Sequence, residues 1–168
     1  MMKKGFTLIE VLVVVLLSSV IFSALFMVMS SGRTTWYEAE TQIALQQELR
    51  KAMRQITDDM RQSGMSQISI PADSVAYSSI SFNVSEGAGG SGSIDWSPIP
   101  INMSLSGGQI IRADGSTTRV LANNITALGF VRLFTSPKIV RINMTAQKTS
   151  TFGRVLNATL DSAIALRN

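Results

Sequence analysis

The chain has 168 residues, with 15 Lys and Arg against 11 Asp and Glu, and it contains neither Cys nor His. This length suffices for one membrane helix and one compact domain with its own core. The missing residue types exclude thiol catalysis, His-based triads and nearly all zinc sites, and a domain of this size does not require disulfides. Two lysines near the N-terminus carry half of the +4 net charge, and the other basic residues are scattered without interleaved aromatic side chains. We therefore expect no nucleic-acid platform, no metal site and no cofactor.

A long apolar segment opens the chain, MMKKGFTLIEVLVVVLLSSVIFSALFMVMSSG. Its uncharged part, residues 11–29, makes a helix of about 28 Å, which is close to the thickness of a bilayer's hydrocarbon core. Lys3 and Lys4 precede it, so the positive-inside bias predicts a cytoplasmic N-terminus and an exported remainder. No proline interrupts the segment, and we expect a continuous helix.

Glu10 is the only ionisable side chain between Phe6 and Gly32. A carboxylate inside a membrane helix costs several kcal/mol unless it is paired, neutralised or close to the interface. A signal anchor could hold it at headgroup depth. An ordinary secretory signal fits poorly, because a charge at this position and a long unbroken apolar run do not match a short apolar core with a small-residue cleavage site. A third interpretation rests on the coincidence of a basic leader, a glycine, a phenylalanine and a glutamate four residues later.

The run Lys-Lys-Gly-Phe-Thr-Leu-Ile-Glu, followed by the apolar helix, closely resembles the N-terminal signature of type IV prepilins and pseudopilins. The resemblance implies that a prepilin peptidase cuts between Gly5 and Phe6 and that Phe6 becomes an N-methylated N-terminus. It also implies that Glu10 helps to bring a subunit into register in a filament. An anion on one subunit and the terminal amine of the next can neutralise each other in an apolar bundle, where neither is stable alone.

Two departures separate the chain from the major pilins of this superfamily. Many of those carry a glycine and then a proline inside the helix, whereas this chain has Ser18-Ser19 and no proline there. Many also close a C-terminal loop with a disulfide, and this chain has no cysteine. Both departures point to a pseudopilin or a minor subunit.

Residues 33–64 contain mostly good helix formers and no glycine before Gly64, which we expect to end the helix. The apolar residues recur at three- and four-residue steps and form one stripe that should bury against the sheet that follows. This stripe comprises Ala39, Ile43, Leu45, Leu49, Ala52, Met53, Ile56 and Met60.

Charged residues on the same segment stand at helical spacings. Glu48 and Lys51 are three apart and Arg54 and Asp58 four apart, so each pair lies on neighbouring turns. Asp58 and Asp59 together could suggest a metal site, but paired acids on a helix face are usually solvated. We expect solvated acids here, and solvated arginines in the second half of the chain.

From residue 67 onward the pattern changes to the period of two that is typical of strands. Residues 85–93 are rich in Gly and Ser and are expected to be a flexible loop. We expect six or seven antiparallel strands with one face on the helix and one face in water. The predicted fold is thus α+β and pilin-like: a long N-terminal helix, half transmembrane and half amphipathic, on an antiparallel sheet. The turns between strands are signalled by Gly107-Gly108, Asp114-Gly115 and Asn123-Asn124.

The predicted organisation is a leader peptide at 1–5, a transmembrane and filament-core helix at 6–32, an amphipathic helix at 33–64 and an exported β-rich domain at 65–168. Loose cues in the second helix, in Gly-Gly-Gln-Ile-Ile-Arg, in residues 121–130 and in the terminal Leu-Arg-Asn make the chain similar to J-type minor pseudopilins of type II secretion and W-type minor pilins. This resemblance implies a non-enzymatic structural subunit near the tip of a short filament at the bacterial inner membrane. Its partners would be other minor and major subunits, the prepilin peptidase and the inner-membrane assembly platform.

Other interpretations stay open. A minor pilin of a competence or adhesion pilus would contact DNA or a surface, and it ranks second because no basic-aromatic patch is visible. A simple anchored ectodomain ranks third. No GxSxG motif occurs, and a Ser-Lys catalytic pair would need Lys138 or Lys148, whose positions the pattern does not fix. Five N-x-S/T triplets, read literally, indicate a glycosylated type II membrane protein, although exposed polar strand faces generate such triplets by chance: they begin at Asn83, Asn102, Asn124, Asn143 and Asn157.

Overall fold

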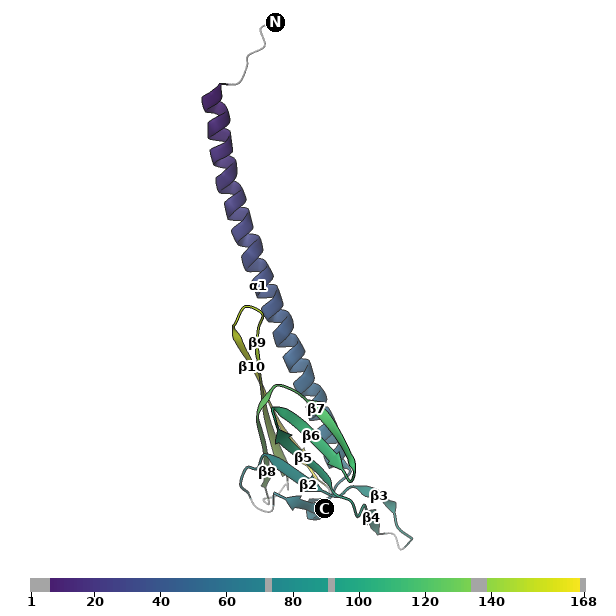
Figure 1. Cartoon of the computed structure of the whole chain (residues 1–168). Coiled ribbons are helices and arrows are strands. Elements are labelled where there is room, and N and C mark those ends of the chain that lie inside the picture. Colours follow the sequence, from purple (N-terminus) through teal and green to yellow (C-terminus); the bar gives the residue numbers. More distant parts are fainter. Residues whose placement is uncertain (1–6, 72–73, 91–92, 134–138, 167–168) are drawn as a thin grey trace. The chain divides into compact units, whose positions relative to one another are not determined.

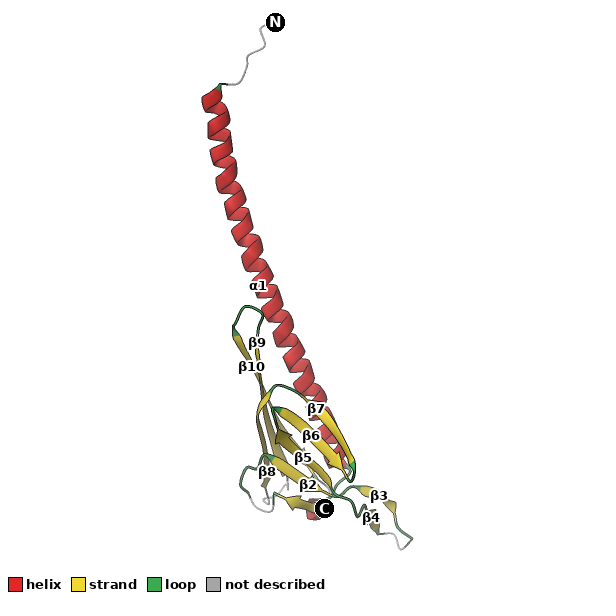
Figure 2. Cartoon of the chain, viewed as in Figure 1, coloured by secondary structure: helices red, strands yellow, loops and turns green. Residues whose placement is uncertain are grey.

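Helix α1 extends from Leu8 to Arg61 and is the one α-helix of the described part of the chain (Figures 1 and 2). The computed structural model describes residues 7–71, 74–90, 93–133 and 139–166. The expected uninterrupted helix is confirmed. Its continuity has a simple cause, since no proline removes a backbone donor within it. It ends earlier than predicted: Gly64 has extended backbone angles (φ −102°, ψ 158°) and precedes the short 3-10 helix η1 (Met65–Gln67), so it is not a left-handed helix stop.

The chain divides into two compact units, Met1–Glu40 and Thr41–Asn168. All strands belong to the second unit, and all their pairings among described residues are antiparallel. They form a five-stranded sheet in the order β1-β2-β5-β6-β7, a three-stranded sheet in the order β10-β9-β8, and the separate hairpin β3-β4. The strands are β1 (Ile68–Ile70), β2 (Ser79–Phe82), β3 (Ser85–Ala88), β4 (Ile94–Trp96), β5 (Ile101–Ser106), β6 (Gln109–Asp114), β7 (Thr117–Ala122), β8 (Ile125–Leu133), β9 (Ile139–Thr149) and β10 (Val155–Ala165).

The predicted turns are where the sequence indicated. Gly107 and Gly108 connect β5 to β6 with φ of 56° and 75°, the left-handed values that a two-residue hairpin turn needs. Gly115 has φ 57° between β6 and β7, and Asn124 has φ 59° just before β8. The two larger sheets are linked at Tyr77, whose amide donates to the Phe130 carbonyl (3.0 Å) and whose carbonyl accepts from the Phe130 amide (2.8 Å).

The core of the second unit lies between the C-terminal part of α1 and the two larger sheets. The apolar stripe on α1 is confirmed from Leu45 onward, whereas Ala39 and Ile43 are exposed. Among the strands, alternate residues are buried as the period of two predicted, and Val140, Ile142, Met144 and Ala146 of β9 line the core together. The α+β pilin-like fold is therefore confirmed: a long apolar N-terminal helix whose C-terminal part packs against antiparallel sheets.

Two expectations about the strands were wrong. The described residues contain ten strands rather than six or seven. The glycine-rich stretch is not simply a flexible loop, because its first part forms β3 and pairs with β4. The Ser85 amide attaches the hairpin to the end of α1 by donating to the Gln62 carbonyl (2.9 Å), and the Ser97 amide closes its base by donating to the Val84 carbonyl (2.8 Å). Gly87, with φ 137°, accommodates the bulge at which the register shifts.

Candidate functional site: the N-terminal helix and its polar positions

Thr7 and Glu10 form the beginning of helix α1. The Thr7 hydroxyl accepts a hydrogen bond from the Glu10 amide (3.3 Å), and the Thr7 carbonyl accepts from the amides of Glu10 (3.1 Å) and Val11 (3.2 Å). A threonine cap with glutamate three residues later is the spacing of a capping box. It places the Glu10 carboxylate in the first turn, where a negative charge is stabilised by the helix dipole. Sequence reasoning missed Thr7, although the Thr-x-x-Glu spacing carries the signal.

The roles assigned to the N-terminal residues stay predictions. Gly5 and Phe6, which the resemblance assigns to cleavage and methylation, lie outside the described residues. Glu10 lies inside them and is exposed on α1. An exposed carboxylate at the start of an apolar helix is accessible to a cation on another molecule, which is the geometry that a role in subunit assembly requires.

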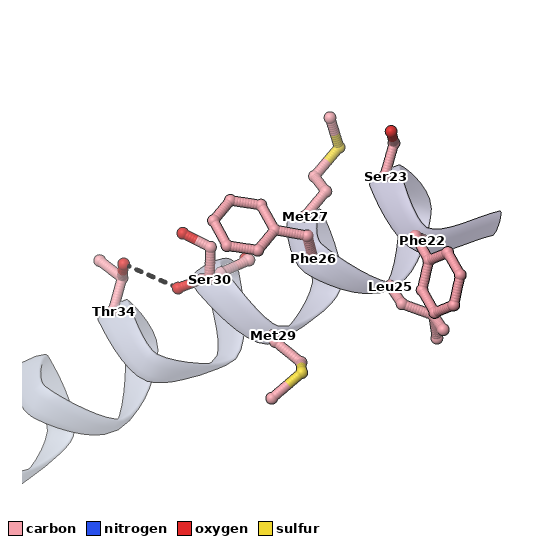
Figure 3. A pocket seen from close by; sticks show the side chains of 9 residues that line it. Phe22, Ser23, Leu25, Phe26, Met27, Met29, Ser30 and Thr34 are labelled. Carbon is pink, nitrogen blue, oxygen red and sulfur yellow. Dashed lines mark hydrogen bonds between the residues drawn. The ribbon is translucent and has the colours of Figure 1, made fainter. Parts of the chain in front are cut away.

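Apolar side chains cover the N-terminal part of α1 on all sides. Its most apolar 18-residue window contains no buried residue, and the helix is long and apolar enough to cross a membrane by length and composition. Phe22 and Phe26 are 70 % and 75 % exposed, and Figure 3 shows side chains between Phe22 and Thr34 projecting in several directions from a single helix. The hollow that these residues line is formed by this helix alone, so it is not an enclosed ligand site. Such a surface is stable only against lipid or other apolar helices.

Three hydroxyl groups of this part of α1, those of Ser19, Ser23 and Thr34, are hydrogen-bonded to carbonyls of the helix itself. Ser19 donates to the Leu16 carbonyl (2.8 Å) and Ser23 donates to the Ser19 carbonyl (2.8 Å). Thr34 donates to the Ser30 carbonyl (3.1 Å), the bond that is dashed in Figure 3. An unsatisfied hydroxyl in hydrocarbon costs several kcal/mol, and these bonds remove that cost without any partner.

In the second unit, Asp59 of α1 pairs with Arg112 of β6. The Asp59 carboxylate accepts from Arg112 Nε at 2.8 Å and from Gln55 Nε2 at 3.0 Å, and Asp114 accepts from Arg112 Nη1 at 3.3 Å. Burial acts to lower the pKa of Arg112, but the hydrogen bonds and charges of Asp59 and Asp114 outweigh it and hold that pKa above its usual value. The expectation that both Asp58 and Asp59 are solvated was therefore wrong for Asp59, which is buried, and Arg112 is not a freely solvated side chain.

Glu48 also has a different partner from the one that helical spacing indicated. Its carboxylate accepts from the backbone amide (2.7 Å) and the side-chain amide (2.9 Å) of Asn123. No ion pair with Lys51 occurs among the described residues. Glu48 thus connects α1 to the turn between β7 and β8.

Arg132 holds the segment that follows α1. Its guanidinium donates to the carbonyls of Met65 (2.6 Å) and Ile68 (2.8 Å), and burial lowers the pKa of this arginine. These charged contacts connect the helix to the sheets and none of them involves a recognisable catalytic set. In the described part of the chain no group of three or more His, Cys, Asp or Glu residues is arranged to hold a metal. Lys138, considered above for a Ser-Lys pair, lies outside the described residues, and Lys148 is exposed on β9.

Comparison with known proteins finds a match in the N-terminal part of the chain. Residues 1–26 match the model of the prokaryotic N-terminal methylation motif. Neither the search of curated proteins nor the search of solved structures finds a match. The motif and the apolar helix fit a membrane-anchored protein that is processed by a prepilin peptidase and assembles with other pilins. The N-terminal methylation motif thus indicates a type IV pilin-like or pseudopilin protein, with a structural rather than an enzymatic role.

Proposed function

We propose that this chain is a minor pseudopilin or minor pilin, a structural subunit of a type II secretion pseudopilus or type IV pilus. The observation that carries the proposal is the coincidence, in one segment, of the methylation motif with an apolar helix that is exposed on all sides. A helix of this kind needs lipid before assembly and the helices of other subunits afterwards.

The proposed path begins in the bacterial inner membrane. The N-terminus is cytoplasmic, residues 1–5 form the leader, and the prepilin peptidase cleaves between Gly5 and Phe6. Phe6 is then N-methylated, residues 6–32 span the membrane and later form the filament core, and residues 33–168 are exported. The hydroxyls of Ser19 and Ser23 support this path, because their bonds to helix carbonyls lower the cost of placing these two donors in lipid or in a protein bundle.

We propose that Glu10 brings the subunit into register with its neighbour in the filament. Its carboxylate is exposed on α1, and the next described cation along the helix is Arg33, more than 30 Å away at 1.5 Å per residue by an order-of-magnitude estimate. The terminal amine of a neighbouring subunit is a cation of suitable size and location. Pairing would remove most of the several kcal/mol that each charge costs in an apolar bundle.

We further propose a position in the tip or initiation complex, as in J-type minor pseudopilins or W-type minor pilins. The support is the uninterrupted helix, which contrasts with the glycine and proline of many major pilins, and the absence of cysteine from the sequence. In this role the subunit associates with other minor and major subunits on the inner-membrane assembly platform, and its loss stops filament growth and protein secretion.

The decisive experiment is mass spectrometry of the N-terminus of the full chain, isolated from membranes with and without an active prepilin peptidase. We expect a mature chain that starts at Phe6 and carries one extra methyl group only when the peptidase is active. Gly5→Leu should leave the leader in place, whereas the matched glycine variant Gly32→Ala should be processed normally. A chain that still starts at Met1 in the presence of the peptidase contradicts the proposal.

A second experiment separates the role of Glu10 in filament assembly from insertion of the helix into the membrane. Glu10→Ala should be inserted and cleaved but should fall by about tenfold or more in filament incorporation, since 1.4 kcal/mol of lost pairing is already tenfold. Glu40→Ala removes an exposed carboxylate from the same helix and should be incorporated normally. Normal incorporation of Glu10→Ala would show that the carboxylate has no part in assembly.

A further inference from the structure

Strand β10 is a long strand that is paired on one side only. It lies beside β9 at the edge of the three-stranded sheet (Figure 1). Each of its residues from Val155 to Ala165 has a partner on β9. The opposite edge of that sheet, β8, is connected to the other sheet through the Tyr77–Phe130 bridge. The remaining sheet edges are shorter, with three residues in β1 and six in β7. β10 is therefore the longest strand edge open to another chain in the described structure.

One contact shows which backbone groups face outward. Gln42 of α1 donates through Nε2 to the carbonyl of Asn157 at 3.0 Å, so the backbone polar groups of Asn157 point away from β9. Because the direction alternates along an antiparallel strand, the amides and carbonyls of Thr159, Asp161 and Ala163 point the same way. Residues 159–163 cover about 17 Å, enough to pair with a strand of five or six residues.

A groove runs along this open edge, between β10 and α1. It consists of two adjoining hollows of about 290 and 380 Å³, which share Arg50 and Leu160. Leu160 is half-buried and supplies an apolar floor, and the wall on the helix side carries Arg50, Arg54 and Arg61. Among the described residues that line the groove, Asp58 supplies the single carboxylate against three arginines, so this lining has a net positive charge.

The three arginines are available to a partner. All three are exposed, and their guanidinium groups make no ion pair or hydrogen bond with another described residue. Arg112 differs from them, because its guanidinium forms ion pairs with Asp59 and Asp114. The groove therefore offers two separate recognition elements. One is the set of arginine side chains on α1, and the other is the set of outward-facing backbone amides and carbonyls of β10.

The spacing of these elements fits a strand with alternate acidic residues. Arg50 and Arg54 are four residues apart on a helix, or about 6 Å along its axis. Side chains on the same face of a strand are two residues apart, or about 6.6–6.8 Å. A strand added beside β10 would direct every second side chain toward α1, where acidic residues would meet the two guanidinium groups.

We propose that the groove between β10 and α1 binds an extended polypeptide segment with acidic residues at alternate positions, by addition of a strand to β10. Backbone hydrogen bonds to residues 159–163 supply the affinity, and Arg50 and Arg54 select for acidic side chains. The proposal goes beyond the structural role above, since it identifies a binding surface on the second unit and does not depend on N-terminal processing.

The test uses the full chain in detergent and a labelled heptapeptide, Thr-Glu-Val-Glu-Thr-Glu-Val, with binding followed by fluorescence anisotropy. We expect saturable binding that weakens as salt is added. Two N-methylated peptides, one for each set of alternate residues, probe strand addition directly. Methylation of the set that faces β10 should weaken binding by at least about tenfold, whereas methylation of the other set should leave it nearly unchanged.

Protein variants test the charge selection. The double variant Arg50→Gln, Arg54→Gln should bind the acidic peptide about 3- to 10-fold more weakly, as expected for two exposed ion pairs. Lys51→Gln, Arg141→Gln removes two exposed cations that do not line the groove and should bind normally. Circular dichroism should show unchanged folding in both variants.

Several results would overturn the proposal. These are the absence of binding up to about 1 mM peptide, equal binding of a peptide with Lys in place of Glu, and equal effects of the two N-methylated peptides. Binding of single-stranded DNA that is lost in the Arg50, Arg54 variant, without peptide binding, would instead identify the groove as a nucleic-acid site.

Discussion

The ion pair between Asp59 and Arg112 leads to an asymmetric prediction for stability. Replacing Arg112 by Met leaves the Asp59 carboxylate, 10 % exposed, with Gln55 as its one remaining side-chain donor among the described residues. Breaking a buried pair in this way costs about 3–5 kcal/mol, and the partial exposure of both partners brings the expected value down to about 2–3 kcal/mol. Replacing Asp59 by Asn leaves Arg112 with Asp114, which is 46 % exposed, so we expect a smaller loss of about 1–2 kcal/mol.

The assay is urea unfolding of the full chain in mild detergent, in a Trp36→Phe background that leaves Trp96 as the single tryptophan. The double variant Asp59→Asn, Arg112→Met should lose less than the sum of the single losses, because each single variant already removes the pair. The pKa of Arg112 is raised, so its contribution is fully present below the unfolded-state pKa and is lost only as pH rises through the higher folded-state pKa. Equal losses for the two single variants, or additive losses in the double variant, would refute the reasoning.

Two further stability predictions use the same assay. Ile56→Ala should cost about 2–5 kcal/mol because this side chain is 0 % exposed in the core, whereas Ile43→Ala, 55 % exposed on the same helix, should stay within about 0.5 kcal/mol of the parent. Glu48→Ala should cost about 1–2 kcal/mol through the loss of two hydrogen bonds from Asn123, and Lys51→Ala should have almost no effect. A large loss of stability for Lys51→Ala would instead support the ion pair between Glu48 and Lys51 that helical spacing indicated.

Features with a local cause could be predicted from the sequence. The apolar run predicts α1 because nothing in it removes a backbone donor, and the turn residues Gly107, Gly108 and Gly115 have the left-handed angles that their positions require. The buried phase of β9 follows from strict alternation of apolar and polar residues. In each of these cases the physical determinant lies within a few residues of the feature it produces.

Features with a distant cause could not be predicted. Asp59 is buried because Arg112, 53 positions away, arrives beside it, and Glu48 accepts from Asn123, 75 positions away. The β3–β4 hairpin could not be predicted because the glycine-rich composition of this stretch indicates a flexible loop. Its strands are held by their pairing with each other and by the hydrogen bond from the Ser85 amide to the Gln62 carbonyl. Spacing on one helix identifies neighbours on that helix and carries no information about a partner from a sheet.

The candidate site divides in the same way. Thr7 and Glu10 interact across three residues, and a search for capping spacings could have found them. The basic groove beside β10 could not be found, because Arg50 and Arg54 look like ordinary solvated helix residues until the sheet places an open strand edge next to them.

The two parts of α1 show how one helix can be adapted to two environments. The N-terminal part exposes apolar side chains on all sides and bonds the hydroxyls of Ser19 and Ser23 to its own carbonyls, so it needs apolar surroundings on every side. The C-terminal part buries one stripe against its own sheets and leaves charged side chains on the remaining face. Glu10 is the single ionisable residue of this first pattern and lies near its beginning, and its carboxylate makes no ion pair within the described part of the chain. We accordingly propose Glu10 as the position of an intermolecular contact, and we expect its substitution to test assembly without disturbing the fold of the second unit.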